Sequence, residues 1–524
     1  MQKEGSSSPN SINWDDIVKW KELPEPEKVV LLNECEEKKQ DIIDAKEKEL
    51  RNLLENNVFE EVEDKGQRRV TTKWIITEKE KDEEKIVKAR LVARGFEEKL
   101  ENTRIDSPTC SRQSLRMCFI VAPTMKWEIH SLDISSAFLQ GNNIERELYL
   151  EPPIEVKEDG IIWKLKRCIY GLSDAPRAWY ERVEQELCAL RAKKSLYDDA
   201  VFIWHQNNTL IGLVVIHVDD FVYCGTSEWN SNVMGAIQKV FKISARHRGT
   251  FKYIGLNIQQ TNDGIHIDQQ PYVESVKCIP LSADRMKMKD SALTSIEKSQ
   301  LRSLTGQLLW ATSQTRPDVA FDACVAGNYG KDASIKSILL ANKCVKKLQA
   351  EKVKIRFVGL KDIKNITVIA YADASHANLP SGASQGGMIV FLECNGMVAP
   401  VMWQSKKTSR VPKSPFAAET MMQAEAADTG ALIARMAEEI FALPAASVKV
   451  ECRTDSKSLI DHLVTSHIIS DSRLRVDIAR LKEMVEVNEI EMRWVPDGEQ
   501  LADPLTKAGT SGKRLLQVLA QGHL

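Results

Sequence analysis

Two adjacent carboxylates interrupt an otherwise apolar stretch of the chain. The sequence LVVIHVDDFVYCG, residues 213–225, has the pattern of a buried β-hairpin and carries Asp219 and Asp220 between its two arms. Burying a charged carboxylate is costly unless it is paired or binds a metal ion. One interpretation of this pair is a simple acidic turn. The other is a hairpin that presents two acids at its tip for chemistry.

A third carboxylate ends an earlier predicted strand. The segment MKWEIHSLDISSAFLQG, residues 125–141, reads as a short strand that ends at Asp133, followed by a turn into a short helical segment. An Asp in this position, taken alone, is usually a turn or cap residue. Three acids at strand ends can also converge to hold two Mg²⁺ ions about 4 Å apart, which activate an attacking 3′-hydroxyl and stabilise a leaving pyrophosphate in nucleotidyl transfer.

Four further acids follow in order in the C-terminal part of the chain. The first ends the alternating strand ITVIAYADAS, the second lies in the first turn of a helical pattern over 417–442, the third ends the strand VKVECRTDS, and the fourth follows the strand EIEMRWVP. They are Asp373, Glu419, Asp455 and Asp503. The β-β-β-α-β-α-β-α order of this region predicts an α/β layer domain. Each acid alone is more often a surface or cap residue, but four together can hold two Mg²⁺ ions that generate a hydroxide and stabilise a leaving oxygen.

Composition limits the class of protein. The 524 residues suffice for several domains. The 72 Lys and Arg against 74 Asp and Glu give a net charge of −2, so binding of nucleic acid would depend on local basic stretches. The 11 cysteines form no C-x-x-C pair or Cys/His cluster, which favours reduced thiols inside a cell and argues against a zinc site. No apolar run reaches the length of a membrane span.

One basic stretch lies in a predicted hairpin near the N-terminus. VTTKWIITEKEKDEEKIVKARLVARGF reads as two strands joined by a charged turn around residues 81–84. Its second strand carries Lys88, Arg90 and Arg94. These cations are interpreted either as a solvated strand face or as contacts to phosphate.

The order and spacing of the motifs resemble the reverse transcriptase of copia-type retrotransposons. The resemblance covers roughly residues 45–507 and rests on KARLVARGF (88–96), HSLDISSAFLQG (130–141), ELYLEPP (147–153), WKLKRCIYGLSDAPRAWY (163–180), HVDDFVYCG (217–225) and YIGLNI (253–258). It implies an α/β and α+β multidomain fold, a right-hand polymerase with fingers, palm and thumb followed by a ribonuclease H-like α/β domain. The expected division is a polar lead-in over 1–44, fingers and palm over 45–260, thumb and connection over 261–362, the ribonuclease H-like domain over 363–510 and a tail over 511–524.

The resemblance also implies roles for single residues. Asp133 and Asp219 are the expected principal metal ligands of the polymerase, with Asp220 as the third acid. The expected ligands of the nuclease are Asp373, Glu419, Asp455 and Asp503. Each site would take two Mg²⁺ ions, with Mn²⁺ as a substitute. The expected substrate-binding residues are Lys88, Arg90, Phe138, Tyr170 and Gly171, and contacts to an RNA–DNA hybrid are expected from Ser375 and residues 404–407.

Phe138 has two alternative roles, in substrate selection and in core packing. It falls where the family places the aromatic ring that excludes a ribose 2′-hydroxyl, whereas Lys88 and Arg90 fall among residues that contact the incoming triphosphate. Packing in the core is the alternative role for Phe138, and the sequence does not separate the two.

The function implied is an RNA-directed DNA polymerase coupled to ribonuclease H. Its expected partners are an RNA template, a DNA primer, an RNA–DNA hybrid, dNTPs and other parts of a Pol polyprotein, with no membrane. The expected location is intracellular, in the cytoplasm and in virus-like particles, with entry into the nucleus. The alternatives are a decayed or domesticated copy that only binds nucleic acid or protein, and a metal-dependent nuclease without polymerase activity. Intact acids at all seven positions favour the enzyme.

The sequence departs from the family pattern at several places. His217 stands where the family has Tyr, and Ser173 with Asp174 stands where it has Lys-Gln. Asp174 is therefore expected to bring a negative charge near the nucleotide and template. In the C-terminal part, FAAET lacks a second acid two residues before Glu419, and WVPDGEQLAD lacks the His-bearing loop of cellular ribonucleases H, so slow nuclease turnover is expected.

Overall fold

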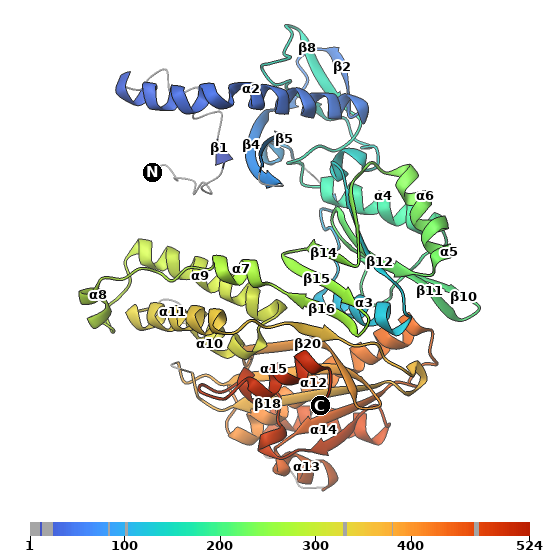
Figure 1. Cartoon of the computed structure of the whole chain (residues 1–524), viewed down its shortest axis with the longest axis vertical. Coiled ribbons are helices and arrows are strands. Elements are labelled where there is room, and N and C mark those ends of the chain that lie inside the picture. The colour runs from blue at the N-terminus through green and yellow to red at the C-terminus, as the bar shows by residue number, and fades with distance from the viewer. Residues whose placement is uncertain are drawn as a thin grey trace.

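The computed structural model describes residues 11–12, 25–81, 84–99, 103–328, 333–379, 381–465 and 471–524. Figure 1 shows a long helix over small sheets at one end, a central sheet, a lateral group of helices and a C-terminal α/β unit at the other end. Among the helices in these ranges, none is both long enough and apolar enough to cross a membrane.

The N-terminal unit consists of a helix packed over the predicted basic hairpin. It contains β1 (Ser11–Ile12), α2 (Glu25–Glu55), β4 (Thr72–Lys81) and β5 (Glu84–Ala93), beside a sheet of β2 (Phe59–Glu63), β3 (Arg69–Val70), β7 (Tyr149–Leu150) and β8 (Ile161–Leu165). The hairpin is in register from Thr72 opposite Ala93 to Lys81 opposite Glu84, as the sequence predicted. The boundary expected at residue 44 is wrong, because residues 25–44 belong to α2, whose Ile42 and Leu53 are buried in one core with Leu91. Residues 1–10 and 13–24 of the expected lead-in lie outside the described residues.

The central sheet is antiparallel and has the strand order β13-β6-β12-β11-β10-β9. Its strands are β6 (Ile129–Ile134), β9 (Lys193–Lys194), β10 (Val201–Gln206), β11 (Thr209–His217), β12 (Asp220–Gly225) and β13 (Ile243–Arg248). Both faces are buried: Phe221 and Tyr223 pack in a core with α4 (Ala175–Ala189) and α6 (Gly235–Val240), whereas Val222 and Cys224 pack in a core with α3 (Arg112–Thr124). Burial on both faces explains why these strands read as continuous apolar runs.

A sheet and a helical group connect the central sheet to the C-terminal unit. The sheet contains β14 (Thr250–Tyr253), β15 (Leu256–Thr261), β16 (Gly264–Asp268) and β17 (Ile355–Phe357), and the helices are α7 (Gln270–Ser275), α8 (Ala283–Lys287), α9 (Ser295–Gln314), α10 (Ala320–Gly327) and α11 (Ile335–Ala350). The boundary expected between residues 260 and 261 therefore cuts β15. The helices share a core of their own, and α9 begins with a capping box between Thr294 and Glu297.

The C-terminal unit contains a mixed sheet with the strand order β20-β19-β18-β21-β22. Its elements are β18 (Thr367–Ser375), β19 (Gln385–Cys394), β20 (Met397–Lys407), α12 (Pro415–Phe441), β21 (Lys449–Thr454), α13 (Lys457–Val464), α14 (Ser472–Glu486) and β22 (Glu491–Trp494). The first three strands are antiparallel and β21 and β22 join in parallel, with the predicted hairpin turn at Asn395-Gly396. The structure confirms the expected mixed architecture of α/β and α+β units, with an α/β unit at the C-terminal end.

The last residues of the chain form part of this unit. Helix α15 (Lys513–Gln521) buries Leu515, Val518 and Leu519, and His523 pairs with Met397 of β20. The tail expected over 511–524 is therefore wrong, because one apolar face of α15 packs into the core.

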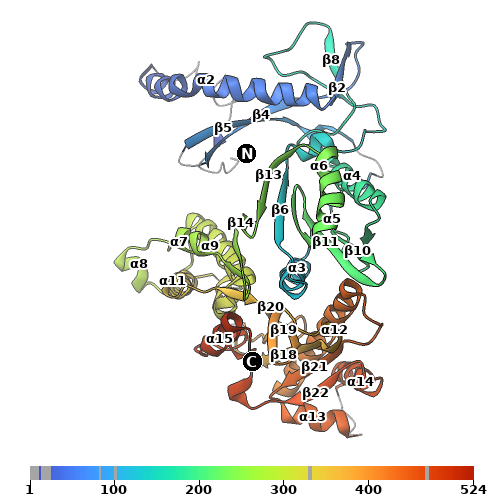
Figure 2. The ribbon, with the colours of Figure 1, turned by 45° about the vertical axis from the view of Figure 1, so that its right-hand side comes forward.

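A buried arginine, Arg116, joins the central sheet to the helical group and to the C-terminal unit. Figure 2 shows α3 between the central sheet and the C-terminal sheet. The guanidinium of Arg116 on α3 donates to the carbonyl oxygens of Ser313 at 2.7 Å and Val401 at 3.1 Å and lies 3.5 Å from the ring centroid of Trp403. Trp403 in turn donates to the carbonyl of Thr312 at 2.8 Å. Burial lowers the pKa of Arg116, and among the described residues no carboxylate pairs with it.

We expect Arg116→Met to lower the free energy of unfolding by roughly 2–4 kcal/mol, because it leaves buried carbonyl acceptors without a donor and removes the contact with the Trp403 indole. The matched control is Arg112→Met, which removes an exposed arginine from the same helix. Urea unfolding followed by tryptophan fluorescence and circular dichroism measures both. Equal midpoints for the two variants would show that Arg116 does not stabilise the joint.

Candidate active sites

The hairpin between β11 and β12 places Asp219 and Asp220 at one edge of the central sheet. His217 pairs with Asp220 across the turn, and Val218 has a φ of 60°. A β-branched residue in this left-handed region is strained. The indole of Trp179 donates to the Val218 carbonyl at 2.7 Å and holds the strained turn in place. The predicted hairpin with both acids at its tip is confirmed.

The register of the sheet brings Asp133 to the same edge. Asp133 on β6 lies directly opposite Asp220 on β12, so the two side chains leave the same face of the sheet. The backbone N–H of Ile134 donates to the Asp219 carbonyl at 3.0 Å, and the Ser244 hydroxyl donates to the Asp133 carboxylate. Burial raises the pKa of Asp219, and the nearby charge of Asp133 raises it further. Asp133, Asp219 and Asp220, the palm acids, are therefore neighbours.

Three of the five expected substrate-binding residues, Arg90, Tyr170 and Phe138, lie together near this edge. Lys88 and Arg90 are exposed on one face of β5, while Ala89 and Leu91 between and after them are buried. The Arg90 guanidinium lies 5.1 Å from the ring centroid of Tyr170 and acts electrostatically on Asp219, whose pKa it lowers. The Tyr170 ring makes an edge contact with Phe138 at 5.5 Å. Arg90, Tyr170 and Phe138 thus form a patch beside the palm acids.

Gly171 lies in a turn that approaches β5 closely. Its φ is +91°, and a Cβ there would lie 2.1 Å from the carbonyl oxygen of Ala93. Only glycine lets this turn approach β5 so closely, and the N–H of Ala93 donates to the Tyr170 carbonyl at 2.8 Å. Gly171 therefore positions Tyr170 against the hairpin.

The negative charge of Asp174 is compensated inside the protein. Asp174 is buried, and Arg146 donates to its two carboxylate oxygens at 2.6 and 3.1 Å. The same guanidinium donates to Glu98 at 2.5 and 3.2 Å. The bidentate pair with Arg146 balances the negative charge that was expected near nucleotide and template.

His217 is half-buried next to the palm acids. Burial lowers its pKa, although Asp219 partly opposes this shift. A neutral imidazole at this position adds no charge beside the acids at neutral pH.

In the C-terminal unit, three of the four expected acids converge. The ligand oxygens of Asp373, Glu419 and Asp455 all lie within 4.8 Å of one another, and no other group of three such residues does so in the described part of the chain. Asp373 lies in β18, Asp455 directly follows the parallel neighbour β21, and Glu419 projects from α12, which packs on β18. Because α12 begins at Pro415, Glu419 is in its second turn and not its first.

Burial raises the pKa values of two acids in this cluster. Asp373 is 1 % exposed, and its Oδ1 has no hydrogen-bond partner. Burial raises the pKa of Asp373 to about 6, although Lys507 and the Thr506 hydroxyl oppose the shift. Burial and the charges of Asp373 and Asp455 raise the pKa of Glu419 to about 9. A buried carboxylate oxygen without a partner, beside two further carboxylates, is suited to a divalent cation.

The fourth acid, Asp503, is held by a lysine that the sequence reading did not single out. Asp503 begins the 3-10 turn η9 (Asp503–Leu505), where a last helix was expected. The Lys507 ammonium lies 2.8 Å from Asp503 Oδ1 and 3.3 Å from Asp373 Oδ2, and the Thr506 hydroxyl also donates to Asp373 Oδ2. The i,i+4 spacing of Asp503 and Lys507 is the signal that could have indicated this pair.

The expected hybrid-contact residues lie on strands beside the acids. Ser375 ends β18, and residues 404–407 end β20. Ser405 accepts from Gln385 at 2.8 Å and donates to the Leu505 carbonyl, and Lys406 pairs with Glu425. Ser405 and Lys406 therefore have partners within the protein.

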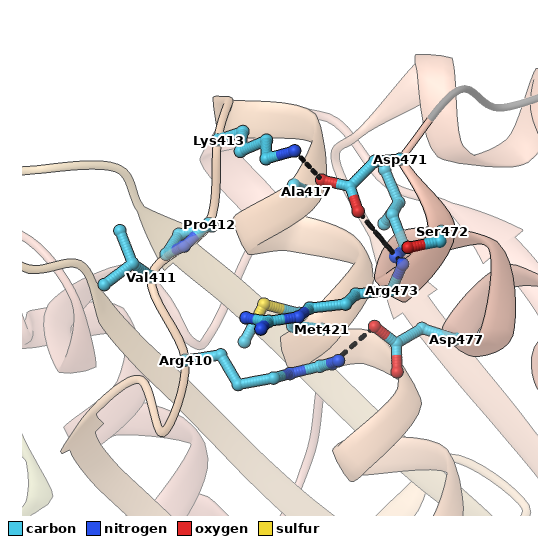
Figure 3. Close-up of a pocket in the computed structure, with 11 residues that line it drawn as sticks. Arg410, Val411, Pro412, Lys413, Ala417, Met421, Asp471, Ser472, Arg473 and Asp477 are labelled. Carbon is cyan, nitrogen blue, oxygen red and sulfur yellow. Dashed lines mark hydrogen bonds and ion pairs between the residues drawn. The ribbon is translucent and has the colours of Figure 1, made fainter.

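A charged groove of about 300 Å³ lies next to the start of α12. Figure 3 shows that the loop after β20 and the start of α14 form its walls. Arg410 pairs with Asp477 at 2.5 Å, and Lys413 pairs with Asp471 at 3.4 Å. Asp471 also accepts from the N–H of Arg473 at 3.0 Å and caps α14. Ala417, where the family more often has an acid, lines the same groove.

Comparison with known proteins identifies relatives of the chain. Residues 56–283 match the family described as reverse transcriptase (RNA-dependent DNA polymerase). The chain is 27 % identical over 521 residues to the retrovirus-related Pol polyprotein from transposon TNT 1-94 of Nicotiana tabacum, a match that covers 92 % of this chain and 38 % of that protein. It is 24 % identical to the Pol polyprotein from transposon RE1 of Arabidopsis thaliana, covering 84 % of this chain and 30 % of that protein. The chain thus spans about a third of the length of these relatives.

Among solved structures, the chain is similar to a foamy viral protease-reverse transcriptase in complex with an RNA/DNA hybrid. The TM-score is 0.49 and the identity 11 %, with 88 % of this chain and 55 % of that chain covered.

The raised pKa of Glu419 predicts that the stability of the folded chain depends on pH. In the folded chain Glu419 keeps its proton up to about pH 9, whereas its ordinary pKa is 4.5. Between these values the folded state binds the extra proton, so stability falls as pH rises. Glu419→Gln removes this cost, and we expect it to stabilise the chain in EDTA by roughly 1–3 kcal/mol at pH 8 and by less at pH 5.5. Asp428→Asn, which changes an exposed acid on the same helix, is the control in thermal unfolding. A gain that does not grow with pH would contradict the assignment.

Proposed function

Because this chain is a relative of the Pol polyproteins of copia-type retrotransposons, we propose that it is an RNA-directed DNA polymerase coupled to ribonuclease H. The observation that carries the proposal is the presence of two separate carboxylate sites on one chain. The palm acids lie within the residues that match the reverse transcriptase family. The nuclease assignment rests on the convergence of Asp373, Glu419 and Asp455.

Both sites are proposed to bind Mg²⁺, or Mn²⁺ in its place. Carboxylate oxygens are the ligands that these cations prefer, and the buried, unpartnered Oδ1 of Asp373 fits such a role. The palm acids would hold the ions of the polymerase site, and Asp373, Glu419, Asp455 and Asp503 those of the nuclease site. When bound, the ions would lower the pKa of the attacking hydroxyl or water and stabilise the leaving oxygen.

The remaining residues of the polymerase site are proposed to position dNTP and primer. Lys88 and Arg90 present cations on an exposed strand face, which suits a triphosphate. The Phe138 ring, supported at its edge by Tyr170, is placed to contact a sugar at the 2′ position.

The two activities are proposed to act on the same nucleic acid in sequence. Copying an RNA template onto a DNA primer yields an RNA–DNA hybrid that blocks synthesis of the second strand, and cleavage of the RNA strand removes the block. The cations of the groove beside α12 and of β20 would contact the hybrid backbone, with little sequence preference.

Two variants separate the activities. We expect Asp219→Asn to reduce primer extension on RNA by at least about a thousandfold, because a lost metal ligand removes a main source of charge stabilisation. Its cleavage of a labelled hybrid should stay near that of the parent. Asp455→Asn should show the reverse pattern, with thermal stability in EDTA equal to or above that of the parent, since it relieves repulsion among the acids. Both assays are run on the same preparations with Mg²⁺.

Each variant is the matched control of the other. Extension by Asp219→Asn at the rate of the parent would contradict the palm assignment, and cleavage by Asp455→Asn at that rate would contradict the nuclease assignment. A parent chain that binds hybrid but shows neither activity would instead support the decayed copy.

The proposed role of Phe138 is tested by its truncation. We expect Phe138→Ala to incorporate ribonucleotides at least about tenfold better relative to dNTPs, because it removes a steric clash that acts on one substrate only. Phe138→Leu, which keeps much of the bulk, should change this ratio less. If Phe138→Ala lowers stability and leaves the ratio unchanged, Phe138 only packs in the core.

A further inference from the structure

The lysine next to the nuclease acids divides them into two unlike groups. Asp373, Glu419 and Asp455 lie within 4.8 Å of one another, and Asp503 is not part of that group. Asp503 instead contacts the Lys507 ammonium at 2.8 Å. The same ammonium reaches Asp373 Oδ2 at 3.3 Å. Lys507 therefore lies between the two acids that a second cation would have to bridge.

The two carboxylate oxygens of Asp373 differ in their contacts. Oδ1 is buried and has no partner, whereas Oδ2 accepts from the Thr506 hydroxyl and pairs with Lys507. Oδ1 is thus free to bind a ligand, whereas Oδ2 is already paired with the positive charge of Lys507. A divalent cation that uses Oδ2 must displace the ammonium.

Lys507 is able to leave this position. Its side chain is 40 % exposed, unlike that of Asp373, so the ammonium can move into solvent when it is displaced. Lysine is a flexible, strongly hydrated point charge, which makes such an exchange less costly than for arginine. The stem begins two residues after the 3-10 turn η9, and rotation about its side-chain bonds moves the charge without moving the backbone.

We propose that Lys507 competes with the second divalent cation of the nuclease site for Asp373 Oδ2 and Asp503 Oδ1. The first cation then binds tightly to the three-acid group, and the second binds weakly because it must replace the ammonium. This inference rests on the proposed nuclease function. It makes hybrid cleavage dependent on a higher concentration of free Mg²⁺ than occupation of the first position requires.

The test is a titration with Mn²⁺ followed by electron paramagnetic resonance of the free ion at pH 8. The full chain carries Asp133→Asn and Asp219→Asn in every sample, so that the palm acids do not contribute. We expect one tight and one weak ion that depend on the nuclease acids. Lys507→Met should tighten the weak ion by about tenfold or more and leave the tight ion unchanged, because it removes the competitor without removing a ligand. Lys507→Arg, which keeps the positive charge, should retain weak binding.

Two further variants test whether the weak ion binds next to Lys507 and Asp503. Lys513→Met makes the same change of charge at an exposed site six residues away and should alter neither ion. Asp503→Asn should abolish the weak ion, both alone and combined with Lys507→Met. In hybrid cleavage by chains with intact palm acids, Lys507→Met should reach half-maximal rate at a lower Mg²⁺ concentration than the parent.

The outcomes separate this inference from the proposed function. If Asp503→Asn abolishes the weak ion and Glu419→Gln weakens Mn²⁺ binding, but Lys507→Met leaves the weak ion unchanged, the competition is overturned and the metal-dependent nuclease site stands. If Lys513→Met tightens the weak ion as much as Lys507→Met, the effect is one of overall charge and the competition is again overturned. If Glu419→Gln has no effect on Mn²⁺ binding, the nuclease assignment fails, and the competition fails with it.

Discussion

The buried guanidinium of Arg116 is the contact on which the arrangement of the two sites depends. It links α3, the end of α9 and strand β20 through hydrogen bonds to carbonyl oxygens and contact with Trp403. A buried cation of this kind is tolerated only where dipoles and an aromatic face replace its water. One apolar core runs continuously from α3 through the C-terminal sheet to α15. The palm acids and the acids of the C-terminal unit therefore belong to one packed body. On the proposed function, this suits a single nucleic acid that passes from one site to the other.

Both sites must hold like charges together, and each does so with strand geometry and a nearby cation. In the central sheet, register places Asp133 opposite Asp220, and Arg90 moderates the raised pKa of Asp219. In the C-terminal sheet, parallel pairing of β18 and β21 brings their acids together, and Lys507 moderates the pKa of Asp373. Backbone hydrogen bonds thus supply the proximity that the carboxylates alone would oppose.

The sequence predicted strands and turns that depend on a few neighbouring residues, and it missed contacts between segments that lie far apart in the chain. The hairpin with Asp219 and the strand positions of Asp133 and Asp455 follow from apolar patterns over a few residues, and the structure has them in place. The partner of Asp174 is Arg146, a contact between different elements that no local pattern specifies. The carbonyls that accept from Arg116 lie 197 and 285 residues away along the chain, so no local pattern specifies them either. The burial of α15 likewise depends on strands far earlier in the chain.

The two sites differ in how their charge is balanced. The palm acids are half-buried at the sheet edge, where water can hydrate them. Asp373 is fully buried, and its cluster keeps its charge low with a proton on Glu419 and the ammonium of Lys507. On the proposed function, the acids of the C-terminal unit must therefore lose a proton or a lysine contact before they bind two cations.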